Sequence, residues 1–152
     1  MEYYYFRNVP NENKIYDLTM MDVNMMKGYS RYDSFNEFLD DYYNCTRWLV
    51  RFKKEFPAYR IAIKHHASAG IDHIQNKIIK DTNVEMIDKY EDSYEVAYNS
   101  RCTVSYGSTI GLELSAHGLP FFFIDPGFRC IYLPDKEDDY IGELRVQSYD
   151  EF

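Results

Sequence analysis

The sequence lacks a long hydrophobic run. No apolar stretch approaches the roughly 18 residues that a membrane-spanning helix needs, and the N-terminus lacks the basic-then-apolar pattern of a secretory signal. Basic residues are also scarce: 17 Lys and Arg stand against 25 Asp and Glu, which gives a formal net charge of −8. This balance argues against nucleic acid as a partner, because phosphate backbones are bound by basic surfaces. It leaves room for a local anion site made from backbone amides and one or two cations.

Cysteine is scarce as well. Cys45, Cys102 and Cys130 are widely spaced and form no C-x-x-C pair, which favours neither a disulfide framework nor a four-ligand zinc site. No carboxylate or cysteine completes a recognised ligand spacing with the histidines, so no metal site is predicted. A reducing cytoplasm is the expected location.

The length of 152 residues suits one domain and leaves little room for a second. Residues 1–33 show no clean hydrophobic period and are predicted to be an irregular N-terminal segment, in which Met1–Phe6 could form a strand. The domain itself is predicted over residues 34–152.

From Ser34 onward the pattern predicts regular elements. Ser34 and Glu37 have the spacing of a capping box, apolar residues then recur at intervals of three and four, and Pro57 ends the helix. Shorter helices are predicted near residues 71–78, 92–98 and 110–117, and strands at 59–63, 84–87, 102–106 and 121–124. Gly118 is predicted just after the last helix, and Pro120 prevents its continuation.

This alternation of strands and helices predicts an α/β fold, in which a parallel sheet is covered by helices on both faces. Residues 148–152 look like the first turn of a further helix, so the domain is expected to be truncated at its C-terminus.

Two loops carry the candidate site, because ligands of open α/β sheets bind beyond the carboxyl ends of the strands. In the more informative loop, Gly107 permits a tight turn, and Ser108 or Thr109 would cap the next helix. Hydroxyls and free amides at such a helix start form an anion site. Glu113, about one and a half turns further on, could accept hydrogen bonds from the hydroxyls of a ribose. A Ser-Thr pair can also be only a cap, and Glu113 can simply lie on a solvated face.

The other loop contains Lys64, His65 and His66. Lys64 could neutralise a phosphate, and either histidine could donate a hydrogen bond to a phosphoryl oxygen or act as an acid toward the leaving group. Strand alternation places Lys64 and His65 on opposite faces, so both serve one ligand only if the loop bends. The simpler alternative is that one histidine packs and the other is solvated.

Between residues 59 and 127 the sequence resembles the C-terminal, donor-binding half of GT-B-fold glycosyltransferases. The resemblance rests on strand, K-H-H, helix, strand, S-Y-E, and then V-S-Y-G-S-T-I-G-L-E-L-S-A-H-G-L-P-F-F-F-I-D. It is nearest to the bacterial surface and capsular polysaccharide group, with its polysialyltransferase-like and Kdo-transferase-like enzymes. The family's His-Pro is His65-His66 in this sequence.

The resemblance implies a Rossmann-like sheet that is one half of a GT-B architecture. It implies that Ser108 and Thr109 hold the donor phosphate, that Glu113 holds the ribose, and that His65 acts on the phosphate or leaving group. The donor would be a CMP- or UDP-linked sugar bound as substrate, with no other cofactor. A GT-B enzyme needs a second half for the glycan acceptor, which cannot fit into residues 1–33. The chain is therefore expected to be a fragment, a split gene product, or a half that works with a companion chain.

Other functions remain open on the sequence alone. A glycerophosphotransferase or an epimerase-like enzyme could use the same pocket. A different class is a non-catalytic, flavodoxin-like interaction domain that docks a partner through its surface, which the 16 tyrosines would suit. As a glycosyltransferase half, the protein would act in the cytoplasm, where it could sit at the inner face of the membrane.

Overall fold

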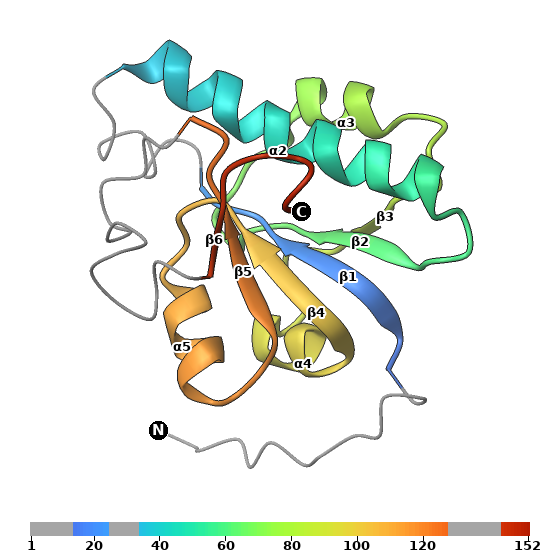
Figure 1. Ribbon diagram of the computed structural model, residues 1–152, viewed down its shortest axis with the longest axis vertical. Helices are drawn as coiled ribbons and strands as arrows, with labels where there is room; N and C mark the ends of the chain where they lie inside the picture. The colour runs from blue at the N-terminus through green and yellow to red at the C-terminus, as the bar shows by residue number, and fades with distance from the viewer. Residues whose placement is uncertain (1–13, 25–33, 128–143) are drawn as a thin grey trace.

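A six-stranded, all-parallel sheet forms the centre of the protein (Figure 1). The computed structural model describes residues 14–24, 34–127 and 144–152. The strands are β1 (Tyr16–Met21), β2 (Ile61–Lys64), β3 (Glu85–Ile87), β4 (Ser100–Ser105), β5 (Phe121–Ile124) and β6 (Arg145–Val146). Their order across the sheet is β3-β2-β1-β4-β5-β6. The predicted α/β class, with a Rossmann-like parallel sheet, is confirmed.

The central strand, β1, lies in the segment for which the sequence predicted no regular structure. Leu18 pairs with Ile61 of β2 on one side and with Cys102 of β4 on the other. Both neighbours of β1 were themselves predicted as strands. The domain therefore extends toward the N-terminus at least to Tyr16, and the boundary at residue 34 moves accordingly. The strand suggested at Met1–Phe6 lies outside the described residues.

In the described part of the chain, helices cover both faces of the sheet (Figure 1). α2 (Phe35–Glu55) and α3 (His73–Ile79) lie on one face, and α4 (Ser93–Tyr98) and α5 (Ile110–Ala116) lie on the other. The predicted cap of α2 is present, because the Ser34 hydroxyl accepts from the Glu37 N–H at 3.5 Å. Asp92 caps α4 in the same way: its Oδ1 accepts from the Tyr94 N–H at 2.8 Å and from the Glu95 N–H at 2.9 Å.

The end of α5 also follows the prediction. Gly118 has a φ of +73°, its N–H donates to Ser115, and the Leu119 N–H donates to Leu114. This pair of hydrogen bonds is the Schellman motif, in which a left-handed residue ends the helix. The turn returns the chain to the sheet as β5.

Strand alternation divides the core into two layers. Leu18, Met20 and Ile63 belong to the layer under α2, whereas Met21 and Ala62 belong to the layer over α4 and α5. All five side chains are buried. The sheet therefore buries apolar side chains on both faces, as parallel sheets between two helix layers do.

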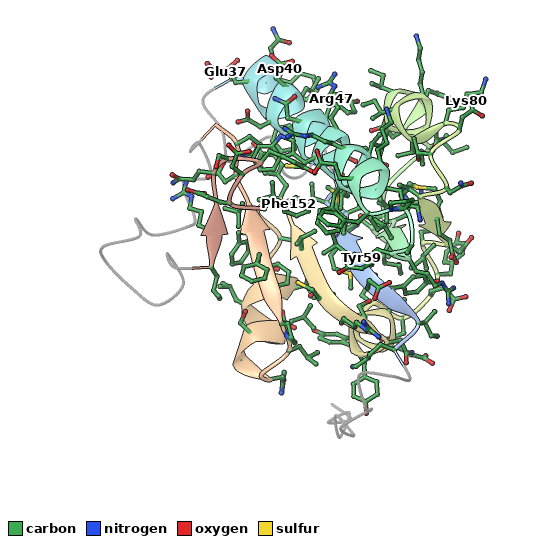
Figure 2. The ribbon with its side chains drawn as sticks, turned by 45° about the vertical axis from the view of Figure 1, so that its right-hand side comes forward. Glu37, Asp40, Arg47, Tyr59, Lys80 and Phe152 are labelled. Carbon is green, nitrogen blue, oxygen red and sulfur yellow. The ribbon has the colours of Figure 1, made fainter. Side chains whose placement is uncertain are left out.

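The C-terminal residues pack against α2. Phe152 lies between α2 and the sheet (Figure 2), and its ring centroid is 6.2 Å from that of Trp48 and 5.5 Å from that of Phe52. The Phe152 N–H donates to the Ser148 carbonyl at 3.3 Å, so residues 148–152 form a turn at the position of the predicted first helical turn.

Candidate functional site

The strand order itself indicates where a ligand would bind. From β1 the chain winds outward through β2 to β3, and then returns across the sheet to β4 and β5. The order therefore reverses between β1 and β4. In open α/β sheets, ligands bind beyond the carboxyl ends of the strands at such a reversal.

A cavity of about 230 Å³ lies at this position. It is bounded by the residues that follow β1, β2 and β4 and by the first turns of α4 and α5. Its lining residues are Met21, Asp22, Lys64, His65, His66, Ala67, Ser93, Tyr94, Ser108, Thr109, Ile110 and Glu113.

Six of the seven predicted site residues line this one cavity: Lys64, His65, His66, Ser108, Thr109 and Glu113. The seventh, Gly107, is not part of the lining but makes the turn that presents Ser108. Its φ of +64° is a left-handed conformation that glycine adopts without the steric cost of a Cβ. The two loops that the sequence singled out therefore meet at one site, although their chemical roles stay predictions.

The start of α5 differs in detail from the expected cap. Thr109 is the N-cap residue, but its backbone is helical (φ −62°, ψ −23°) and its side chain makes no capping hydrogen bond. Within the described residues, the hydroxyls of Ser108 and Thr109 have no hydrogen-bond partner. Both hydroxyls can therefore bind an anion, whereas the Gly111 and Leu112 N–H groups already donate to the Ser108 and Thr109 carbonyls. Because α5 has only seven residues, its dipole adds little to this site.

Glu113 points into the same cavity and is held by a residue that the sequence did not suggest. Its Oε2 accepts a hydrogen bond from the hydroxyl of Tyr94, on the neighbouring helix α4. This hydrogen bond, followed by partial burial, raises the pKa of Tyr94 to about 12, so the hydroxyl remains a donor at neutral pH. A carboxylate has about four acceptor positions, so Glu113 can hold Tyr94 and still accept from a ligand.

Lys64 lines the cavity but is mostly occupied by the protein. Its side chain is buried, and Nζ donates to the carbonyls of His65 at 2.7 Å and Lys89 at 3.2 Å. Burial lowers the pKa of Lys64, although nearby carboxylates such as Asp88 oppose the shift. Two of its three donors tie the loop after β2 to the loop after β3, and one remains for a ligand. Lys64 and His65 reach the same cavity despite the strand alternation.

The two histidines differ in their surroundings. His66 Nδ1 accepts from the Ser68 N–H at 3.1 Å, which places the proton of the neutral ring on Nε2. His65 Nδ1 lies 3.4 Å from Oδ2 of Asp22, and its side chain is 23 % exposed. Asp22 is buried and follows β1 directly.

Asp22, Ser93 and Tyr94 are the polar lining residues that sequence reasoning missed. Asp22 was missed because β1 was not recognised; a polar residue directly after a buried parallel strand would have been a candidate. Ser93 and Tyr94 follow the Asp92 cap, and only the packing of α4 beside α5 brings them to the cavity.

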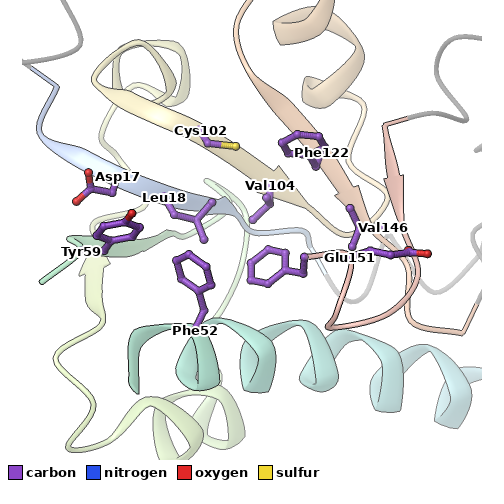
Figure 3. A pocket seen from close by; sticks show the side chains of 10 residues that line it. Asp17, Leu18, Phe52, Tyr59, Cys102, Val104, Phe122, Val146 and Glu151 are labelled. Atoms are coloured by element: carbon purple, nitrogen blue, oxygen red, sulfur yellow. The ribbon is translucent and has the colours of Figure 1, made fainter. Parts of the chain in front are cut away.

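A second cavity, of about 210 Å³, lies between α2 and the sheet (Figure 3). Phe52, Val104 and Phe122 contribute apolar surface, and Asp17 and Glu151 add carboxylates. Its lining contains no Lys, Arg or His and none of the predicted site residues. A phosphate would meet only like charge in it.

Within residues 14–24, 34–127 and 144–152, no group of three His, Cys, Asp or Glu side chains is placed to hold a metal ion. No helix in the same segments combines the length and apolarity needed to cross a bilayer. Comparisons of the chain with protein-family models, curated proteins and solved structures found no match.

Proposed function

We propose that this chain is the nucleotide-sugar-binding half of a glycosyltransferase for surface polysaccharide synthesis. The observation that carries the proposal is that residues chosen from two separate loops of the sequence line one cavity at the strand-order reversal. Ser108 and Thr109 would bind the donor phosphate, and Glu113 would bind the ribose.

The charges of the cavity fit an anion that carries hydroxyl groups. Lys64 supplies a cation, and Ser108 and Thr109 supply hydrogen-bond donors. Glu113, further along α5, supplies a hydrogen-bond acceptor. Hydrogen bonds to a charged phosphate contribute about 1.5–3 kcal/mol each. Two or three of them reach micromolar affinity only with a further contact, which the ribose on Glu113 would add.

The size of the cavity also supports a half-site. Typical ligand clefts enclose roughly 300–1,000 Å³, more than the cavity of about 230 Å³ found here. The described residues would therefore surround the phosphate and ribose and leave the sugar open. In a GT-B enzyme a second half would close over the sugar and supply the base that takes the acceptor proton.

The reaction would be displacement at the anomeric carbon. The bond from this carbon to the donor phosphate breaks, the electron pair leaves with the phosphate oxygen, and the acceptor hydroxyl forms the new bond as it loses its proton. The task of this chain is to stabilise the leaving phosphate, which preorganised donors do effectively. Alone, it is expected to bind the nucleotide and to transfer little or no sugar.

Calorimetry of the chain with CMP, UDP, AMP and GMP tests the proposal. Loss of one bond to a charged phosphate predicts that Ser108→Ala weakens CMP or UDP binding by roughly 10- to 150-fold. The matched control is Ser148→Ala, an exposed serine outside the cavity, which should bind as the unsubstituted chain does. Equal nucleotide binding by Ser108→Ala would contradict the donor site. Absence of binding by all four nucleotides would also contradict it, and would favour the non-catalytic interaction domain.

A further inference from the structure

Asp22 and His65 contact each other in the lining of the cavity. Both line it, and Oδ2 of Asp22 lies 3.4 Å from Nδ1 of His65, a long hydrogen bond. His65 Nε2 has no hydrogen-bond partner within the described residues. The imidazole is therefore engaged by the protein at one nitrogen and available to a ligand at the other.

The other oxygen of Asp22 is fixed by two donors. Oδ1 accepts from the Tyr42 hydroxyl at 2.8 Å and from the Val23 N–H at 2.9 Å. Tyr42 is buried in α2, and burial next to Asp22 raises the pKa of its hydroxyl well above the ordinary range. The Val23 N–H can only donate, and the Tyr42 hydroxyl, protonated at neutral pH, donates to the carboxylate, so Asp22 is anchored through Oδ1 and its Oδ2 is directed at the histidine.

We propose that Asp22 is a positioning residue that holds His65 as the Nδ1–H tautomer and leaves Nε2 for a ligand phosphate. The functional part of this inference rests on the proposed nucleotide site; the tautomer itself does not. When the ring also carries a proton on Nε2, its positive charge is balanced by Asp22 and its Nε2–H donates to a phosphate oxygen. The proton stays on the ring as the phosphate leaves.

The anchoring makes the effect of one substitution predictable. In Asp22→Asn, the side-chain oxygen must take the Oδ1 position, because Tyr42 and Val23 both donate there. The amide NH₂ then faces His65 Nδ1 and donates to it. This reverses the tautomer, so that the neutral ring carries its proton on Nε2, and it removes the charge that balances the imidazolium.

Two-dimensional ¹⁵N–¹H spectra of the imidazole rings report the tautomer of each histidine. At a pH at which His65 is neutral, we expect Nδ1–H in the unsubstituted chain and Nε2–H in Asp22→Asn. Asp40→Asn is the matched control, because Asp40 lies exposed on α2 (Figure 2) and should leave His65 unchanged. The exposed His73 serves as a reference within each spectrum.

An Nε2–H ring in the unsubstituted chain would overturn the proposal, and so would an unchanged tautomer in a folded Asp22→Asn. If that variant does not fold, the spectrum of the unsubstituted chain still decides.

UDP calorimetry separates this inference from the proposed function. Replacing a charged hydrogen bond by a neutral one predicts that Asp22→Asn binds UDP roughly five- to tenfold more weakly. The expected tautomers with no nucleotide binding would uphold the Asp22–His65 pair and overturn the donor site. Nucleotide binding with an Nε2–H ring in the unsubstituted chain would do the reverse.

Discussion

At the scale of single residues, the cavity combines groups that are free with groups that are already held. Ser108 and Thr109 offer hydroxyls with no partner in the described chain, whereas Glu113 and Lys64 are fixed by bonds to Tyr94 and to loop carbonyls. Fixed groups lose less rotamer freedom when a ligand arrives, which favours binding. The cavity is thus partly preorganised before any nucleotide enters.

Replacing Tyr94 by Phe tests this preorganisation. The substitution removes the donor that holds Glu113, so the carboxylate becomes mobile and UDP affinity should fall by about 2- to 10-fold in calorimetry. Thermal unfolding should change little, because the Tyr94–Glu113 bond is exposed. Tyr90→Phe is the matched control, since Tyr90 is 82 % exposed. Equal UDP affinity in the Tyr94 and Tyr90 variants would contradict a positioning role for Tyr94.

The sequence alone identified the site residues that belong to a recognisable local motif. Gly107, Ser108 and Thr109 form a turn whose chemistry is visible in three consecutive letters. Asp22 belongs to no such motif, and the S-Y-E motif that contains Tyr94 assigned it no role at the site. Asp22 matters because β1 ends at the cavity, and Tyr94 because α4 lies beside α5; both facts depend on contacts between distant parts of the chain.

At the scale of elements, α5 is packed very closely against β5. A Cβ on Gly111 would overlap the ring of Phe121 and approach that of Phe123, so only glycine lets the helix lie this near the strand. The same helix begins with Thr109 and carries Glu113. The packing of α5 on β5 therefore sets the position of half of the cavity.

Gly111→Ala should destabilise the protein. Overpacking costs about 1–3 kcal/mol, of which the better helix propensity of Ala returns up to about 1. We expect a net loss of about 1–2 kcal/mol in urea unfolding, together with weaker UDP binding because α5 shifts. Gly70→Ala is the control, since no atom lies within 4 Å of its added Cβ. Unchanged stability of Gly111→Ala would show that α5 is not held by this contact.

Elements with local signals were predicted well, and elements without them were missed. α2 and α4 have capping residues, and β5 occupies the predicted range of 121–124. β1 has one β-branched residue in YDLTMM and gave no strand signal. β6 has two residues and is held by a buried ion pair, with Arg145 Nε 2.9 Å from Asp125, which only the folded chain reveals.

At the scale of the whole molecule, the strand order determines where the loops meet. The sequence predicted that the loops after β2 and β4 share one edge of the sheet, and they do. It did not predict that β1 lies between these strands, which places Asp22 between the two loops. Strand order depends on how all the strands and helices pack against one another, so no local sequence pattern could have predicted it.

Stability should fall at alkaline pH. Burial raises the pKa of Tyr42 above its ordinary value of 10.0 and that of Cys102 from 9.0 to about 12. The unfolded chain therefore releases these protons at lower pH than the folded one, and unfolding becomes easier as pH rises from about 9 to 12. The lowered pKa of Lys64 acts in the opposite direction, but only up to its ordinary 10.5.

Urea unfolding at pH 8, 10 and 11 measures this effect. We expect the free energy of unfolding to decrease along the series, and the decrease to be smaller in Tyr42→Phe, which has no phenol at that position to titrate. Equal stability at the three pH values would contradict the burial of these groups.

The central claim is that the cavity beyond β1, β2 and β4 binds a nucleotide, and a ¹⁵N–¹H amide titration of the chain with UDP and with CMP tests it most directly. The account predicts saturable shifts concentrated at Ser108, Thr109, Ile110 and Glu113 and in the loop that contains His65. It would be contradicted by spectra that do not change, or by shifts that gather instead around Phe52 and Phe122 in the second cavity.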